Sequence, residues 1–208
     1  MKGHRWFAAL YDRIIASEER GFLGKVREEI IGDLKGDVLE IGAGTGLNFS
    51  RYQDGARVVA TEPDAYMLQR AQMRLSVAKV PIDLRQAPAE ELPFEDATFD
   101  AVVSTLVMCS VRDPAKALSE IHRVLRPDGL YHFYDHVRYK NALGAFFQDA
   151  VTPVWSWFGA GCHPNRDVSR LVREAGFEII EASLTNPLPP LPPLVISRPH
   201  LKAVAKPL

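Results

Sequence analysis

The chain has 208 residues, of which 47% are hydrophobic and 25% are charged, and its formal net charge is -1. A chain of this length normally builds one hydrophobic core, so we expect a single domain that spans residues 1–208. Because 25 basic side chains are balanced by 26 acidic ones, the chain lacks the basic excess of most nucleic-acid-binding proteins. We therefore expect no nucleic-acid partner.

The cysteines and the first residues of the chain indicate the cellular compartment in which we expect the protein. Two cysteines are too few for a disulfide framework, and no Cys/His cluster has the spacing of a zinc site, which predicts a reduced, cytoplasmic protein without a bound metal. Charges interrupt the first six positions, and no stretch approaches the roughly 20 apolar residues of a spanning helix. We expect neither a signal peptide nor an integral membrane segment, and the sequence leaves the oligomeric state open.

Strand and helix patterns alternate along the chain, which is typical of a mostly parallel sheet with helices on both faces. The predicted elements up to the middle of the chain are helices at 6–15 and 22–31, strands at 37–41 and 57–61, a helix from 63 to 78, and strands at 82–85 and 99–104. These elements predict N-terminal helices over residues 1–35 and the start of a cofactor-binding core that runs from 36 to 137.

The second half continues the alternation and ends in closing strands. Its predicted elements are a helix at 114–125, a strand at 130–137, an apolar and aromatic stretch at 141–158, a helix at 166–174, a strand at 177–184, a proline-rich linker at 187–193 and a last strand near 201–205. We expect residues 138–176 to form a lid and the last helices, and residues 177–208 to close the sheet.

The strongest local pattern is Glu40-Ile41-Gly42-Ala43-Gly44-Thr45-Gly46, between a predicted strand and a helix. Glycines there remove side chains that would keep a ligand from the backbone, and they tolerate positive φ angles. About twenty residues later Glu62 ends the second strand, where nucleotide-binding α/β folds place an acid for ribose hydroxyls. The loop and the acid together predict an adenosine-bearing cofactor at the C-terminal edge of the sheet.

The spacing of the glycines distinguishes between two cofactors. Dinucleotide binders use G-x-G-x-x-G, which lets a helix N-terminus meet a pyrophosphate. Here the pattern is G-x-G-x-G, and Glu40 precedes it. A carboxylate there would repel a pyrophosphate but favours the cationic sulfonium and ammonium groups of S-adenosylmethionine. The sequence therefore predicts S-adenosylmethionine as the cofactor.

Three later blocks follow the glycine loop in order: residues 89–94 (AEELPF), 99–102 (FDAV) and 123–129 (RVLRPDG). With these blocks the chain resembles the class I S-adenosylmethionine-dependent methyltransferases of the methyltransferase type 11-like group. The resemblance implies an α/β fold with a Rossmann-like, doubly wound sheet of seven strands, the last antiparallel and inserted between the fifth and sixth. The cofactor-binding residues that it implies are Glu40, Gly42, Ala43, Gly44, Gly46, Asn48, Glu62, Pro63, Met67, Ala89, Glu90, Thr105 and Leu106.

The resemblance also implies roles within this set. Residues 40–46 would line the methionine moiety, Glu62 would hold the ribose, and Thr105 with Leu106 would form the floor under the sulfonium.

For the adenine, the resemblance implies that Met67 covers the ring and that Ala89 and Glu90 meet its edge. A role for Met67 as a core side chain of an amphipathic helix stays an alternative. The chain departs from the family at Pro88, where an acid commonly binds the adenine amino group. That contact is therefore expected from Glu90, from the backbone or from water.

Four further segments, residues 104–111, 134–137, 158–162 and 198–200, resemble the alkyl thiol methyltransferases of the methyltransferase-like group. The same segments overlap with bacterial phospholipid N-methyltransferases and, more loosely, with quinone-ring C-methyltransferases. The implied function is methylation of a small-molecule acceptor, with a lipophilic thiol as the leading candidate and an amine head group or a quinone ring as alternatives. A protein that binds the cofactor without catalysis is a further alternative.

The predicted catalytic residues are Asp135 and His136, at the end of the fifth strand, where active sites of open α/β folds collect. An imidazole there can remove a proton or stabilise a thiolate, although a structural hydrogen bond is an equal alternative. The predicted acceptor-binding residues are Tyr11, Cys109, Phe147, Trp155 and Cys162.

The aromatic segment 146–158 predicts an apolar lid. Two alternatives stay open: the segment completes the core, or it makes peripheral contact with a membrane.

Overall fold

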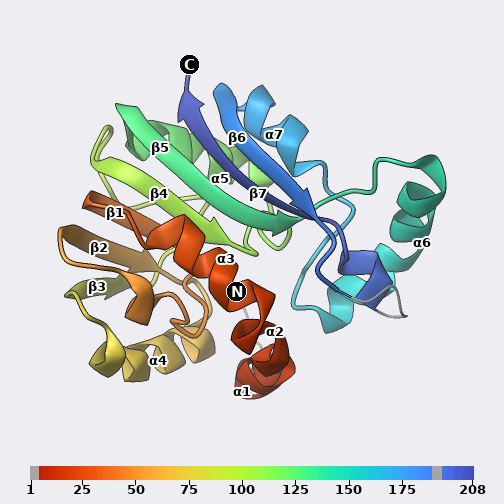
Figure 1. Cartoon of the computed structure of the whole chain (residues 1–208), viewed down its shortest axis with the longest axis horizontal. Helices are drawn as coiled ribbons and strands as arrows, with labels where there is room; N and C mark the ends of the chain where they lie inside the picture. Colours follow the sequence, from red (N-terminus) through yellow and green to blue (C-terminus); the bar gives the residue numbers. More distant parts are fainter. Residues whose placement is uncertain (1–4, 189–193) are drawn as a thin grey trace.

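The computed structural model describes residues 5–188 and 194–208, which form one seven-stranded sheet with helices on both faces (Figure 1). The strands are β1 (Gly36–Ile41), β2 (Ala56–Thr61), β3 (Ile82–Arg85), β4 (Phe99–Thr105), β5 (Leu125–His136), β6 (Phe177–Thr185) and β7 (His200–Pro207). Their order is β3-β2-β1-β4-β5-β7-β6, and β7 runs antiparallel to both of its neighbours while the other paired strands are parallel. The predicted fold class is confirmed.

Helices cover the two faces of the sheet. They are α1 (Arg5–Ile14), α2 (Ala16–Arg20), α3 (Phe22–Ile31), α4 (Ala65–Arg74), α5 (Pro114–Val124), α6 (Ala142–Phe158) and α7 (Val168–Glu174), with 3-10 turns η1 (Phe49–Arg51), η2 (Leu75–Val77) and η3 (Leu194–Ser197). On one face α5 and α7 bury Leu118, Ile121 and Val172 against the strands. On the other face α3 buries Ile30 and Ile31. In Figure 1, α3 crosses in front of the sheet and α5 and α7 lie behind it.

Short polar side chains cap the N-termini of four helices. Asp64 accepts hydrogen bonds from the first backbone N–H groups of α4, and Asp113 does the same for α5. Asn141 and Asp167 cap α6 and α7. Such caps satisfy donors that have no partner within the helix. At α4, α5 and α6, which follow β2, β4 and β5, they fix the point at which the chain turns back from the carboxyl end of the strand.

The elements differ from the sequence prediction at several points. The strand predicted from residue 130 begins earlier, because β5 starts at Leu125 directly after α5. The first predicted helix, 6–15, corresponds to α1, and a further short helix that was not predicted, α2, lies between it and α3. The aromatic stretch is a single helix, α6, which stands at one end of the molecule in Figure 1. The proline-rich linker at 187–193 falls largely on residues 189–193, which lie outside the described residues. Within the described residues, no helix has the length and hydrophobicity needed to cross a lipid bilayer.

Candidate active site

The carboxyl ends of β1, β2 and β4 meet at one edge of the sheet, and the glycine loop follows β1 there. Gly44 has φ +59°, and a Cβ atom built on it would meet no atom within 4 Å. At Gly46, with φ +80°, a Cβ would lie 2.8 Å from the Phe49 ring and 3.2 Å from the Cα of Ala71 in α4. Gly46 therefore permits close packing on α4. Gly44 instead leaves its backbone open to a ligand, as the predicted cofactor requires.

Glu62, the acid after β2, accepts one backbone hydrogen bond from the glycine loop and one from the start of α4. Its Oε2 accepts from the N–H of Gly44 and its Oε1 from the N–H of Asp64, each at 2.8 Å. Burial raises the pKa of Glu62 to about 7, although these two bonds act to lower it. Each carboxylate oxygen has a second lone pair. The group can thus hold the loop and still accept a hydrogen bond from a ribose hydroxyl.

Glu40 lies buried at the end of β1. The side chains of Asn48 and Tyr52 donate to its two oxygens, each at 2.9 Å. Burial raises the pKa of Glu40 to about 7, while the two hydrogen bonds lower it. A buried carboxyl with such a pKa is readily ionised by a nearby positive charge. This property fits a cationic cofactor.

Asn48 connects Glu40 to the N-terminal helices. Its Oδ1 accepts a hydrogen bond of 2.8 Å from Arg27 of α3, and its Nδ2 also lies 3.4 Å from Oγ1 of Thr105. Arg27 in turn pairs with Glu19 of α2 at 3.0 Å. The sequence prediction included Asn48 and Thr105 but missed Arg27, Tyr52 and Glu19, because no local motif marks them.

The helix α1 lies against the glycine loop and α4. Thr45 donates a hydrogen bond of 2.7 Å to Asp12, and Arg74 of α4 pairs with Asp12 at 2.8 Å. Arg74 also donates to the backbone oxygen of Thr45 at 2.7 Å. Tyr11 is next to this contact, and burial raises the pKa of its hydroxyl. Asp12 and Arg74 were not predicted, and together they fasten the N-terminal helix over the loop.

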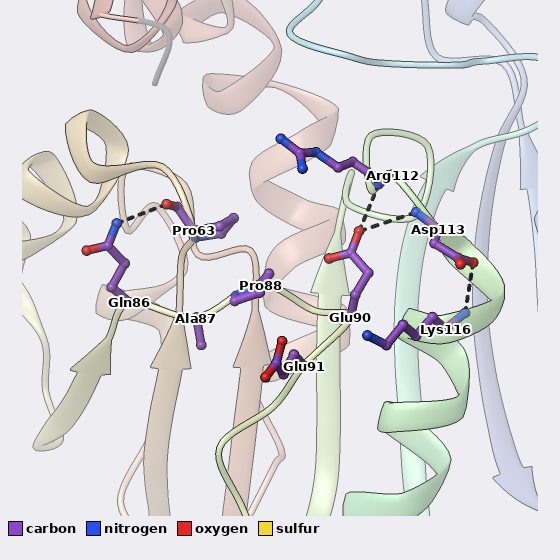
Figure 2. Close-up of a pocket in the computed structure, with 9 residues that line it drawn as sticks. All are labelled: Pro63, Gln86, Ala87, Pro88, Glu90, Glu91, Arg112, Asp113 and Lys116. Carbon is purple, nitrogen blue, oxygen red and sulfur yellow. Dashed lines mark hydrogen bonds between the residues drawn. The ribbon is translucent and has the colours of Figure 1, made fainter. Parts of the chain in front are cut away.

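A cavity of about 410 Å³ opens beyond β2 and β3 (Figure 2). Pro63 lies on its β2 side, and Ala87, Pro88 and Glu90 lie on the loop after β3. The Oε1 of Glu90 accepts from the N–H groups of residues 112 and 113, at 2.9 and 3.3 Å, so it fastens this loop to the start of α5. Pro88, the departure from the family pattern, lines the cavity directly.

Four residues expected at the adenine and the sulfonium do not line this cavity. They are Met67, Ala89, Thr105 and Leu106. Met67 of α4 and Ala89 are buried. Thr105 ends β4, and Leu106 after it adopts φ +60°, although it is not glycine. Its N–H donates to the carbonyl of Tyr134 in β5 at 2.7 Å. Backbone strain of this kind is often found at functional sites, and it turns the chain sharply after β4.

Asp135 and His136, at the end of β5, lie beside the two cysteines. Asp135 is fully buried, its Oδ1 accepts from the N–H of Cys109 at 3.1 Å, and burial raises its pKa well above the ordinary value. The Nδ1 atom of His136 lies 3.5 Å from Sγ of Cys162. The structure thus brings together the predicted catalytic residues and two of the predicted acceptor-binding residues.

The aromatic residues of α6 divide between the protein interior and the surface. Trp155 is partly buried, whereas Phe147 is 46% exposed and Trp157 is 76% exposed. Gln148 is buried and anchors the helix: its side-chain oxygen accepts from the N–H of Tyr139 at 2.7 Å, and its amide donates to the carbonyl of Ile196 at 2.9 Å. Most of these rings therefore do not complete the core.

Known proteins share both the sequence pattern and the fold. Residues 39–133 match a family model described as a methyltransferase domain. Thiol S-methyltransferase TMT1B of Homo sapiens is 31% identical over 204 residues, 93% of this chain and 80% of that protein. Phosphatidylethanolamine N-methyltransferase of Cereibacter sphaeroides is 32% identical over 73% of this chain and 75% of that protein. An S-adenosylmethionine-dependent methyltransferase structure from Thermotoga maritima aligns with a TM-score of 0.68 at 21% identity, covering 97% of this chain and 95% of that chain.

Proposed function

This chain belongs to the class I S-adenosylmethionine-dependent methyltransferases, and we propose that it methylates the sulfur of a small, lipophilic thiol. The enzyme class and the cofactor follow from the family. The acceptor is our inference, and so are the residues that bind it.

The observation that carries the proposal is the apolar segment that follows the expected sulfonium floor. Thr105 and Leu106 lead directly into Val107, Met108 and Cys109, all three of which are buried. A lipophilic acceptor needs no polar partner among such side chains, whereas a polar group buried there would lack one. The similarity to a human thiol S-methyltransferase supports a thiol as the acceptor.

The proposed cofactor contacts use the geometry of the loop. The open backbone at Gly44 would face the methionine moiety, and Glu62 would accept a ribose hydroxyl. Glu40 would supply negative charge near the sulfonium and ammonium groups, through its network with Asn48. The cavity beside Pro63 and Pro88 would admit the adenine, with Met67 and Ala89 packed behind it. S-adenosylmethionine supplies the electrophilic methyl carbon when it is bound.

The transfer itself is an in-line displacement. The acceptor, as its thiolate after the proton has passed to solvent, forms the new S–C bond. The donor, held by the glycine loop and Glu62, would supply the methyl group and would leave as a neutral thioether that keeps the electron pair of the broken C–S bond. The protein contributes mainly by aligning the reacting atoms and excluding water. Asp135 positions the loop after β4 through its bond to Cys109.

We propose α6 as the lid over the acceptor. Its buried contacts come from Ala145, Gln148 and Thr152, while its other face presents exposed apolar side chains. These exposed side chains are Leu143, Phe146, Phe147, Val154, Trp157 and Phe158. Such a face suits the capture of an acceptor that partitions out of water, including one that resides at a membrane surface.

The test is a methyl-transfer assay with the purified chain, S-adenosylmethionine and three acceptors: an alkyl thiol, phosphatidylethanolamine and a quinone. Mass spectrometry would detect the methylated product and S-adenosylhomocysteine. We expect the methyl thioether. Methylation of phosphatidylethanolamine alone would favour the second candidate, which the similarity to the Cereibacter sphaeroides enzyme supports. Saturable cofactor binding without any methylated product would instead indicate a non-catalytic binder.

A further inference from the structure

Three metal-binding side chains from separate segments meet at the acceptor end of the site. Cys109 belongs to the loop after β4, His136 ends β5, and Cys162 follows α6. Their Sγ and ring nitrogen atoms all lie within 4.8 Å of one another. Both cysteines are buried and not joined in a disulfide, and His136 is partly exposed. Two thiols and an imidazole are a ligand set that suits zinc.

The spacing of Cys162 and His136 agrees with tetrahedral coordination, and Cys109 lies within 4.8 Å of both. Zn–S bonds of about 2.3 Å and Zn–N bonds of about 2.0 Å place tetrahedral ligand atoms about 3.5 to 3.8 Å apart. The distance from Sγ of Cys162 to Nδ1 of His136 is 3.5 Å. Only small side-chain movements would therefore be needed to bring all three atoms onto one ion.

A buried carboxylate beside the cluster provides an independent indication. Asp135 is adjacent to His136 and bonded to the backbone of Cys109 through Oδ1. Its Oδ2 is also buried, and among residues 5–188 and 194–208 it has no hydrogen-bond partner. An unpaired buried carboxylate oxygen is costly. A cation held by the three neighbouring ligands would interact favourably with this oxygen.

The loops that carry the ligands are also held in place. The N–H of His163 donates to the carbonyl of Cys109 at 2.6 Å, which joins the segment of Cys162 to the loop after β4. His200 packs against His136 with ring centroids 4.6 Å apart, and its Nδ1 lies 2.9 Å from the carbonyl of Arg198. Supporting contacts of this kind keep metal ligands in a fixed orientation.

We propose that Cys109, His136 and Cys162 bind a thiophilic divalent cation of the zinc class. On binding, both thiols lose their protons, the imidazole coordinates in its neutral form, and the protons pass to solvent. The ion joins the ends of β4, β5 and α6 into one rigid unit beside the methyl-transfer site. This assignment does not depend on which acceptor the enzyme uses.

The test uses the full chain, reduced and freed of metal, and titrated with Co²⁺ as a spectroscopic probe. We expect one Co²⁺ per chain, with visible bands of tetrahedral cobalt and a near-ultraviolet thiolate-to-cobalt charge-transfer band. Zn²⁺ should displace the cobalt and abolish both signals. Zn²⁺ should also raise the melting temperature of the wild-type chain, because an ion that binds the folded state stabilises it.

Single variants identify the ligands. Cys109→Ser, Cys162→Ser and His136→Gln should each weaken Co²⁺ binding by about tenfold or more, and each cysteine variant should reduce the charge-transfer band. His132→Gln is the matched control, because His132 lies on the same strand and faces the same side as His136 but is outside the cluster. It should bind Co²⁺ like the wild type.

S-adenosylhomocysteine binding by each variant serves as the folding control, since the cofactor contacts lie outside the cluster. Failure of the reduced wild-type chain to bind Co²⁺ would overturn the proposal, as would equal Co²⁺ binding by the double variant Cys109→Ser/Cys162→Ser. A Cys109–Cys162 disulfide in the isolated protein, with no metal uptake after reduction, would likewise overturn it. A negative thiol-methylation assay with intact Co²⁺ binding would refute only the proposed acceptor.

Discussion

The backbone N–H of Gly44 donates a hydrogen bond of 2.8 Å to Oε2 of Glu62. This bond joins the loop after β1 to the acid after β2, so the two cofactor-binding signals of the sequence form one structural unit. Burial and the bond act in opposite directions on the pKa of Glu62, and burial dominates. The same carboxylate thus shapes the loop and remains available to the ribose.

Replacing Glu62 by Ala should weaken S-adenosylmethionine binding by about 1 to 3 kcal/mol, because ribose hydroxyls lose their acceptor and the N–H groups of Gly44 and Asp64 lose theirs. Isothermal titration calorimetry measures this change directly. Glu95→Ala, at an exposed position outside the site, removes the same charge and should leave the affinity unchanged. An unaltered affinity in Glu62→Ala would remove this residue from the cofactor site.

The pKa values of Glu40 and Glu62, both about 7 in the ligand-free protein, predict a pH-dependent affinity. A cation favours the ionised carboxylates, so binding of the positively charged donor should tighten as the pH rises from 6 to 8. S-adenosylhomocysteine lacks the sulfonium charge and should show a smaller dependence. Equal pH profiles for the two ligands would contradict an electrostatic role for these acids.

Glu40→Gln should stabilise the ligand-free protein at pH 8. Folding raises the pKa of Glu40 from 4.5 to about 7, so the folded state binds the proton more tightly than the unfolded state. Stability is therefore lost as the pH rises from about 4.5 to 7, and the full penalty, about 3 kcal/mol, persists above pH 7. Glutamine avoids this charge, accepts from Asn48 and can donate to the Tyr52 hydroxyl.

Urea unfolding at pH 8 would measure the effect, and we expect the free energy of unfolding to rise by about 1 to 3 kcal/mol. The same variant should bind S-adenosylmethionine more weakly. Glu95→Gln is the control for surface charge and should change neither quantity. If the variant is less stable than the wild type at pH 8, the hydrogen bonds from Asn48 and Tyr52 stabilise ionised Glu40 by more than its burial costs.

Asp135→Asn should lower turnover without loss of cofactor affinity. The change keeps an oxygen for the N–H of Cys109 but replaces the second carboxyl oxygen by an amide group, which shifts the loop beside the acceptor. Misplacement of the acceptor can cost roughly 100-fold in rate. The measurements are kcat, KM for the acceptor and the cofactor dissociation constant. Equal losses of turnover and cofactor affinity would contradict a role for Asp135 at the acceptor.

The contact between α1 and the glycine loop should slow the release of the cofactor product. Asp12→Asn weakens the ion pair with Arg74, whose side chain is 30% exposed. We expect the release of S-adenosylhomocysteine in stopped-flow experiments to accelerate several-fold, because partly exposed pairs contribute about 1 kcal/mol or less. An unchanged rate would show that α1 does not control access.

The sequence by itself determined the order of strands and helices, the glycine loop and Glu62, because these features depend on local patterns. Hydrophobic periodicity identifies a strand or a helix from a few consecutive residues. The positive φ angles at Gly44 and Gly46 favour glycine, so these residues mark the turn in the sequence itself. The antiparallel last strand came from the resemblance to a family rather than from any pattern in the chain.

Only the tertiary structure decided which distant side chains meet. Arg27 reaches Asn48, and Asp12 reaches Arg74, across segments with no shared motif. The sequence indicated no metal site, yet the ends of β4, β5 and α6 place Cys109, His136 and Cys162 within 4.8 Å. Metal-ligand spacing in a sequence reveals only ligands from neighbouring segments. Here packing of the sheet edge brings the three side chains together, and no local pattern encodes that packing.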